Sequence, residues 1–242
     1  MGEGHDEVAL IRAEAELSVT EGGCAFCGVT QEQFAINGQT QQWPRGSHLK
    51  WFAGFDDLGG ISAADARNAM AVALREIVEC CGLTFEDVAS QHNANLIINL
   101  ARMDGPSGVL ADCGVPMGNV STDRTQLPMR LDTGEKWILS ATPTGNVIDF
   151  QRVFLHEALH FCGLGHKPNS IREPALISPM YSPAIRNLQP ADKAELVRRY
   201  GTPKPVVVPP GPPGGARVVY GTHVIEIDGV KWQAAGSYKR LP

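Results

Sequence analysis

Three histidines and a glutamate in the segment HEALHFCGLGH are the residues best suited to chemistry. His156 and His160 are four residues apart, so on a helix both imidazoles face one side and can hold one metal ion. Glu157 can act on a water at that metal without being a ligand. Gly163 can adopt a positive φ, which would end the helix and bring His166 back as a third ligand. Three neutral histidines leave one position open, as in a catalytic zinc site, so we expect one catalytic zinc ion with Glu157 as the catalytic residue.

A helix must carry these histidines, and the sequence predicts it at 147–162. Apolar periodicity and cap signals predict two more helices, at 61–81, where Ser62 is the N-cap candidate, and at 190–200. Strands are expected at 48–55, 84–88, 94–100, 109–115 and 136–141. Strands and helices in this order indicate an α/β sandwich with a mixed sheet.

The composition narrows the classes of function. The chain has 242 residues, of which 43% are hydrophobic and 19% are charged, so it can bury a core and is not a largely disordered protein. The net charge is −5 and no basic patch is visible, so we expect no nucleic-acid partner. No apolar run of about 18 residues is present, so we expect no membrane span. The start of the chain lacks a basic stretch followed by an apolar one, so no signal peptide is visible.

Prolines mark a boundary towards the end of the chain. Six of the 17 prolines lie between Pro203 and Pro213, a stretch typical of a stiff, extended linker. Beyond it, in residues 216–242, apolar and polar residues alternate on either side of Asp228-Gly229. This dipeptide is a signal for a hairpin turn. A module of this size holds little core alone, so we expect it to dock on the main domain, to pair with another chain or to form a frayed tail. The oligomeric state stays open.

The extended pattern HExxHxxGxxH is typical of metzincin metallopeptidases, in which a methionine-containing turn follows the zinc helix. The candidate for this Met-turn is Met180, in the segment ALISPMYS. The zinc segment, this turn, the stretch LQPADKAELVRRYG and the stretch HLKWFAGF together resemble the matrixin family, the matrix-metalloproteinase branch of the metzincins. The resemblance implies a mixed twisted sheet with three helices and a Met-turn. It also implies a zinc metalloendopeptidase, a hydrolase that cleaves peptide bonds in extended protein or peptide substrates.

The resemblance covers about residues 43–201, and its limits set the boundaries of the other regions that we expect in the chain. We expect a pro-segment-like region at 1–42, a matrixin-like zinc metallopeptidase domain at 43–201, a Pro/Gly-rich linker at 202–215 and a small β-hairpin module at 216–242. An extended substrate would lie antiparallel to an edge strand around 109–115, because backbone pairing grips any sequence. The segment Pro174–Pro183 would form a wall of the specificity pocket.

The resemblance also implies a structural calcium ion, which matrixins hold with a D-G-x-G/N-x-V/I loop and a later D-x-x-E. The segments DGPSGV and DTGE fit these patterns, and Ca²⁺ prefers carboxylate and carbonyl oxygens, although DGPSG is also a generic loop sequence. The expected calcium-site residues are Asp104, Gly105, Ser107, Val109, Asp132 and Glu135. Matrixins carry a second, structural zinc, but Asp112 and Arg130 stand where two of its histidines would be. We therefore expect one zinc ion in this chain.

Latent matrixins place a prodomain thiol on the catalytic zinc, in a P-R-C-G-V-P-D motif. Cys27, in the segment CGVT, lies 16 residues before Trp43, close to the family spacing, although the flanking Arg, Pro and Asp of the motif are replaced. A thiolate is a good fourth zinc ligand, so Cys27 is a candidate ligand in a latent state. Two other readings stay open: Cys24 and Cys27 could form a disulfide or a separate metal site, or this segment could be a flexible N-terminus. A closer match, CGVP at 113–116, lies inside the domain and is treated as a coincidence.

Two alternatives to a peptidase stay open. The domain could be a zinc hydrolase that acts on something other than protein, or a catalytically inactive zinc-binding module on a metzincin fold. Glu157 argues against the inactive module, because binding alone needs no general base. Calcium and a zymogen-like start indicate an extracellular or released protein, although no signal peptide is visible.

Overall fold

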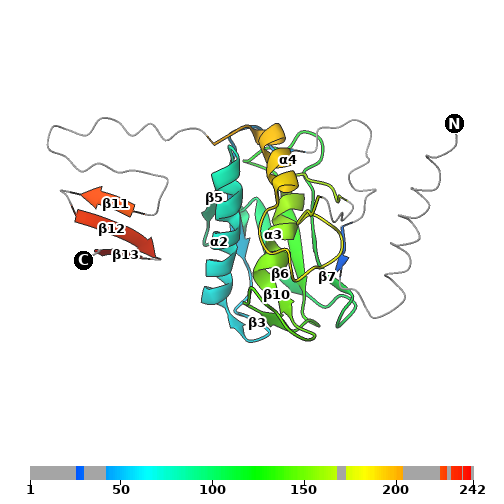
Figure 1. Cartoon of the computed structure of the whole chain (residues 1–242). Helices are drawn as coiled ribbons and strands as arrows, with labels where there is room; N and C mark the ends of the chain where they lie inside the picture. The colour runs from blue at the N-terminus through cyan, green and yellow to red at the C-terminus, as the bar shows by residue number, and fades with distance from the viewer. Residues whose placement is uncertain are drawn as a thin grey trace, which may run out of the picture. The chain divides into compact units, whose positions relative to one another are not determined.

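The structure is a computed structural model that describes residues 26–29, 42–167, 173–203, 224–227, 230–235 and 237–240. The chain forms two compact units, residues 1–203 and residues 204–242, and each is described by itself. The first unit contains the large sheet, the helices and the histidine segment (Figure 1).

A six-stranded sheet forms the body of the first unit, in the order β1-β7-β8-β6-β2-β5. Its strands are β1 (Phe26–Cys27), β2 (His48–Ala53), β5 (Thr84–Asp87), β6 (Leu96–Ala101), β7 (Val109–Cys113) and β8 (Leu127–Asp132). Neighbouring strands run parallel except for β7 and β8, which run antiparallel. Alternation along β2 buries Leu49, Trp51 and Ala53, so one face of the sheet forms the core.

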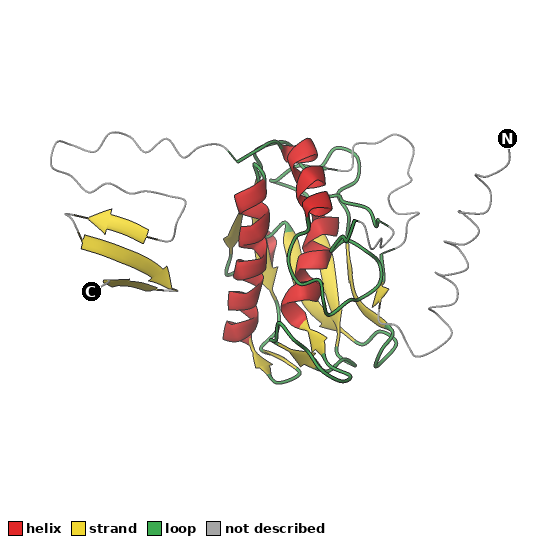
Figure 2. Ribbon diagram, viewed as in Figure 1, coloured by secondary structure: helices red, strands yellow, loops and turns green. Residues whose placement is uncertain are grey.

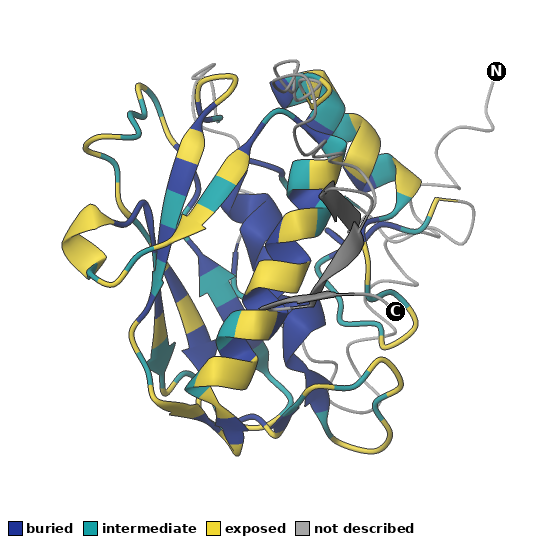
Figure 3. Cartoon of the chain, turned by 90° about the vertical axis from the view of Figure 1, so that its left-hand side faces the viewer, coloured by how far each residue is buried: buried dark blue, intermediate teal, exposed yellow. Residues whose placement is uncertain are grey.

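Three helices cover that face of the sheet (Figure 2). They are α2 (Ala63–Cys80), α3 (Phe150–Phe161) and α4 (Pro190–Tyr200). Ser62 caps α2 by accepting a hydrogen bond from the backbone N–H of Asp65, and Gly201 ends α4 with a φ of 76°. Every residue of α3 is buried (Figure 3). Because α3 is enclosed on all sides, the fold fixes the side chains that it carries.

Two short strand pairs and one turn of 3₁₀ helix complete the first unit. These are β3 (Asp57–Leu58) with β4 (Ile61–Ser62), β9 (Trp137–Ile138) with β10 (Ile148–Asp149), and η2 (Gln91–Asn93). The pair β9 and β10 matters for the site because β10 leads directly into α3.

The expected α/β fold with a mixed sheet and three helices is confirmed, and β8 is the main difference from the expected elements. The sequence predicts no strand at 127–132, where Pro128 lacks the N–H group that a central strand normally uses. The structure nevertheless pairs Pro128 with Ile97 of β6. The helix expected from Val147 begins at Phe150, because the two residues of β10 pair with β9 instead.

The second unit is a three-stranded antiparallel sheet in the order β11-β12-β13. Its strands are β11 (Val224–Ile227), β12 (Val230–Ala235) and β13 (Ser237–Arg240). β11 and β12 pair Ile227 with Val230, and β13 is a strand that the sequence does not predict. Most of the regions expected at 1–42 and 202–215 lies outside the described residues. In the described part of the chain, no helix combines the length and apolar character needed to cross a membrane.

Candidate metal centre

Helix α3 and the turn after it bring the three predicted histidines together. His156 and His160 lie one helical turn apart and are buried. Gly163, with a φ of 81°, turns the chain so that His166 returns to the same point. The Nε2 atom of His160 is 3.2 Å from Nε2 of His156 and 3.0 Å from Nε2 of His166. Ligand nitrogens in a tetrahedral zinc site are about 3.3 Å apart, so the three atoms fit one zinc ion.

Backbone carbonyls fix which ring nitrogens face this centre. Nδ1 of His156 donates to the carbonyl of Leu176 at 2.7 Å, and Nδ1 of His160 donates to the carbonyl of Leu164 at 2.8 Å. A carbonyl only accepts, so the neutral rings carry their proton on Nδ1 and a lone pair on Nε2. Two lone pairs 3.2 Å apart repel each other unless a cation lies between them. The tautomers therefore fit a metal ion.

Burial keeps these imidazoles neutral, which is the form that binds metal. Desolvation lowers the pKa of His156 well below its ordinary value and lowers the pKa of His160 to about 3. The pKa of His166, which is less enclosed, falls to about 4 for the same reason. The histidines are thus deprotonated at neutral pH and need no proton release before binding a cation.

Glu157 lies beside the histidines on α3 and is 1% exposed. Its Oε2 atom has no hydrogen-bond partner among the described residues. Desolvation raises the pKa of this carboxyl to about 8, while a hydrogen bond with the Cys27 thiol acts in the opposite direction. A buried carboxyl with a free oxygen and a pKa near neutrality is suited to taking up and releasing a proton.

Cys27 places a sulfur atom at the same point. Its Sγ is 3.4 Å from Nε2 of His160, and the donor atoms of Cys27 and the three histidines all lie within 4.8 Å of one another. β1 holds the cysteine there by pairing in parallel with β7, and the N–H of Cys27 donates to the carbonyl of Pro179 at 3.0 Å. Burial raises the pKa of the thiol well above its ordinary value, so the sulfur ionises only where a metal ion compensates its charge. Cys24 lies outside the described residues.

A tight turn and a buried carboxylate support His156 from outside α3. The turn spans residues 175–178, and the carbonyl of Leu176 within it accepts a hydrogen bond from Nδ1 of His156. Asp192 of α4 is 0% exposed, and its Oδ2 accepts hydrogen bonds from the N–H of Leu176 at 2.8 Å and of Gln189 at 2.9 Å. Its Oδ1 accepts from the N–H of Ile177 at 3.3 Å. One carboxylate therefore ties the start of α4 to the turn that orients a metal ligand.

A hydrogen-bonded turn lies between the histidine segment and Met180. The N–H of Ser178 donates to the carbonyl of Ala175 at 3.3 Å, so this turn spans Ala175–Ser178, and its three apolar residues, Ala175, Leu176 and Ile177, are all buried. Met180 follows the turn, is half-buried, and accepts a hydrogen bond from Arg152 with its carbonyl. The role of Met180 in a Met-turn stays a prediction.

The residues expected to bind calcium come together in two neighbouring loops. Asp104, Asp132 and Glu135 all accept hydrogen bonds from backbone N–H groups there, and Asp132 is 0% exposed. The donors are the N–H groups of Met103, Gly105, Ser107, Val109 and Gly134. Within the described ranges, the only group of three or more potential metal-ligand atoms within 4.8 Å of one another is that of Cys27 and the three histidines. The carboxylates thus organise the loops, and calcium stays a prediction.

Asp112 and Arg130 occupy the positions where a second zinc site would need histidines. They lie opposite each other on β7 and β8 and form an ion pair. Each side chain is therefore engaged by the other. Cys113, in the second CGV segment, is the buried last residue of β7 and belongs to the sheet.

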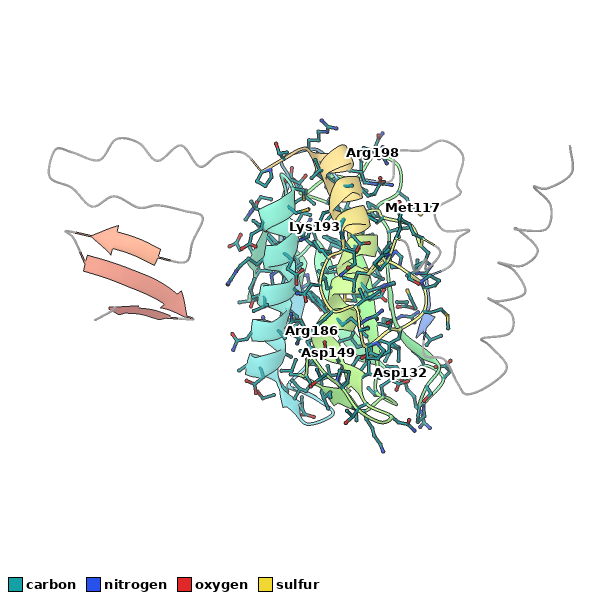
Figure 4. All side chains as sticks on the ribbon, in the orientation of Figure 1. Met117, Asp132, Asp149, Arg186, Lys193 and Arg198 are labelled. Carbon is teal, nitrogen blue, oxygen red and sulfur yellow. The ribbon has the colours of Figure 1, made fainter. Side chains whose placement is uncertain are left out.

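Sequence reasoning missed the charged and aromatic residues that lie near the start of α3. Arg152, one helical turn before His156, is 3% exposed, and its guanidinium lies 4.4 Å from the centroid of the Tyr181 ring. Asp149 and Arg186 form an ion pair at 2.6 Å and lie next to each other at the start of α3 (Figure 4). One sequence signal could have found Arg152: it is the only cation in the apolar stretch that leads into the zinc segment.

The fold and the site together define a class of protein. A buried helix carrying HExxH against a mixed sheet, with a third histidine delivered by a turn, is the arrangement of metzincin-type metallopeptidases. The family model described as Matrixin matches residues 42–201. The chain belongs to the matrixin family of metallopeptidases, which bind zinc. A comparison with curated proteins finds no match.

Proposed function

We propose that this protein is a zinc-dependent endopeptidase that hydrolyses peptide bonds in extended protein substrates. The observation that carries the proposal is the convergence of three histidine Nε2 atoms beside Glu157, a buried carboxyl with an unpartnered oxygen. Membership of the matrixin family supports it. Three neutral imidazoles are also the donor set of many catalytic zinc sites, which keep one position for chemistry.

The roles of the residues follow from their positions. When bound, a zinc ion supplies a Lewis acid that polarises a peptide carbonyl and lowers the pKa of water. The three histidines hold it through Nε2, and backbone carbonyls keep His156 and His160 in orientation. Glu157 acts as the general base, taking a proton from the attacking water and passing it to the nitrogen of the leaving amine. The water oxygen bonds to the carbonyl carbon as the C–N bond breaks, which gives a carboxylate and an amine.

β7 is the strand that we propose to bind the substrate backbone. One of its edges pairs with β8, and the other edge carries β1 in the parallel direction. A substrate would displace β1 and run antiparallel to β7, where backbone hydrogen bonds grip it regardless of sequence. β1, which occupies this edge of β7, therefore runs in the opposite direction to the proposed substrate.

We extend the proposal to a latent state in which Cys27 is a fourth zinc ligand. The sulfur lies 3.4 Å from Nε2 of His160, and the N–H of Val29 donates to it at 3.3 Å, a bond that favours a thiolate. Val29 is 4% exposed, which anchors the chain directly after the cysteine. A thiolate at this point would take the position that water needs, so the enzyme would be inactive until this segment leaves.

The test compares three forms of the full chain: wild type, Cys27→Ala, and Cys27→Ala combined with Glu157→Gln. We expect one zinc per chain in each form by metal analysis, and cleavage of casein by Cys27→Ala that a chelator abolishes. Glu157→Gln should keep the zinc and slow cleavage by about 10²–10⁴-fold. Glu86→Gln, which changes an exposed glutamate, serves as the matched control and should keep the Cys27→Ala rate.

Each outcome bears on a different part of the proposal. Undiminished cleavage in the Glu157→Gln form would contradict its role as the base. Equal rates for wild type and Cys27→Ala would contradict the latent state alone. Stoichiometric zinc with no cleavage of any protein by Cys27→Ala would favour a non-peptidase or an inactive module instead.

Calcium binding near Asp104, Asp132 and Glu135 is a separate proposal. Burial raises the pKa of Glu135, and the charges of Asp132 and Asp104 add to this effect. A bound cation would offset the repulsion among the three carboxylates. We expect Ca²⁺ to raise the melting temperature of the wild type more than that of Glu135→Gln. A melting temperature that does not respond to Ca²⁺ would contradict the proposal.

A further inference from the structure

A small pocket adjoins the metal centre between α3 and the segment after the turn. Its volume is about 10 Å³, and its lining includes Leu110 of β7, Arg152 and Glu157 of α3, and Ser178 and Tyr181. A space of this size holds about one water molecule, and Cys27 also lines it, so a short side chain could enter only after the Cys27 segment has left. The pocket is also bordered by residues with unused hydrogen-bond donors, which is unusual for a buried site.

Arg152 is a buried cation whose donors are only partly used. It is 3% exposed, Nε donates to the carbonyl of Ile185 at 2.8 Å, and Nη2 donates to the carbonyl of Met180 at 3.4 Å. A guanidinium has five N–H groups, so three have no acceptor among the described residues. Asp149 lies close enough to act on Arg152 electrostatically but pairs with Arg186. A buried charge without an ion-pair partner is normally unfavourable, so an anionic group that enters the pocket would be stabilised.

Ser178 is a second and independent observation in the same pocket. It is 2% exposed, and its Oγ has no hydrogen-bond partner within the described ranges. A hydroxyl can donate to an oxygen that enters the pocket. Leaving a buried polar atom without a partner is costly, so Ser178 and Arg152 both favour a ligand that brings hydrogen-bond acceptors.

We propose that this pocket selects substrates with a short carboxylate side chain, such as that of aspartate, directly after the cleaved bond. The inference rests on the proposed peptidase function and on the antiparallel direction of the substrate. Cys27, at the metal centre, pairs with Ala111 of β7, and the pocket borders Leu110, one residue earlier. An antiparallel substrate passes Ala111 before Leu110, so the pocket receives the residue on the C-terminal side of the cleaved bond.

The charges around the pocket agree with a carboxylate ligand. A guanidinium binds a carboxylate with two parallel hydrogen bonds, and Arg152 has free N–H groups for this. Glu157 also lines the pocket and would add a negative charge when ionised, whereas Arg152 and a zinc ion held by the three histidines would add positive charge. An apolar side chain would leave the donors of Arg152 and Ser178 unpaired, and sites built to form hydrogen bonds reject such analogues strongly.

The test uses the full chain with Cys27→Ala as the parent enzyme. Its cleavage sites in casein are read by mass spectrometry, and one site is made as a peptide series that carries Asp, Asn, Ala or Leu directly after the cleaved bond. We expect kcat/KM for the Asp peptide to exceed that for the Leu peptide by about 10-fold or more. Arg152→Leu should lower this ratio by about 10-fold or more, and Ser178→Ala should lower it by less. Arg124→Leu removes an exposed cation outside the pocket and should leave the ratio unchanged.

The possible results separate this inference from the proposed function. A parent enzyme that cleaves the Leu peptide as well as the Asp peptide would overturn the inference, and so would an unchanged ratio in Arg152→Leu. Should Arg152→Leu fail to fold or to hold zinc, Arg152→Lys and Ser178→Ala decide instead, since both are expected to lower the ratio. Peptides that stay intact with every form, or cleavage that survives Glu157→Gln, would refute the proposed function itself.

Discussion

Asp192 links the last helix to the metal centre, and replacing it with asparagine tests that link. Its carboxylate accepts three backbone N–H groups, those of Leu176, Ile177 and Gln189, at 2.8, 3.3 and 2.9 Å. Asparagine has nearly the same shape but replaces one oxygen with an NH₂ group. In its better orientation it keeps the two bonds of Oδ2 and turns its NH₂ towards the N–H of Ile177.

The expected cost follows from these contacts. A hydrogen bond to a charged group contributes about 1.5–3 kcal/mol and one to a neutral group about 0.5–1.5 kcal/mol, so weakening two bonds costs about 2 kcal/mol. An unpaired buried N–H at Ile177 adds about 1–3 kcal/mol, giving a total of about 3–5 kcal/mol. Because the turn also orients His156 through the carbonyl of Leu176, zinc affinity should fall by about 10–100-fold.

Two measurements check this prediction. Urea unfolding gives the loss of stability for the metal-free and zinc-loaded protein, and competition with a chelator gives the zinc affinity. Asp65→Asn is the matched control, because Asp65 is also an aspartate in the first turn of a helix but is exposed on α2. Its zinc affinity should equal that of the wild type.

The two readouts refute different steps of the reasoning. An Asp192→Asn variant as stable as Asp65→Asn would show that the carboxylate does not hold the turn. Reduced stability with unchanged zinc affinity would show that the turn does not control the orientation of His156.

Two further predictions concern charged groups away from the metal. Arg186→Leu leaves Asp149 buried without its ion-pair partner and should lower the free energy of unfolding in urea by about 3–5 kcal/mol. Adding Asp149→Asn should restore part of this free energy. Strictly additive losses in the double variant would show that the two residues are not coupled. Hydrogen bonds from Arg198 and Arg199 lower the pKa of Glu195 to about 2. The resulting stabilisation is present above the unfolded pKa of about 4.3 and is lost as the pH falls towards 2. Arg198 is largely exposed, so solvent screening limits the stabilisation to about 1 kcal/mol, and Glu195→Gln should remove this part of the acid dependence.

The sequence predicts the chemistry of the centre well because that chemistry is local. The helical repeat fixes His156 and His160 on one face, and Gly163 lets the chain return His166 within a few residues. The same local rules predict Ser62 as the cap of α2 and the full length of α4. Each of these signals lies within a span of about a dozen residues.

Contacts between distant segments explain what the sequence did not predict. β8 forms despite Pro128 because β6 and β7 flank it on both sides. A turn at Ala175–Ser178, which Asp192 holds through the N–H of Ile177, precedes Met180 and is not visible in the residue pattern. A pattern of residue types cannot show which backbone groups a distant carboxylate will hold.

The sequence by itself thus determined the three histidines, the glutamate between them and the helix that carries them. Only the tertiary structure decided that Cys27 meets these histidines, that Asp192 supports them through a turn, and that Arg152 lies buried beside them with unused donors. The physical reason is the range of the interactions. Spacing on one helix follows from backbone geometry alone, whereas burial and long-range hydrogen bonds exist only after the sheet and the helices have packed.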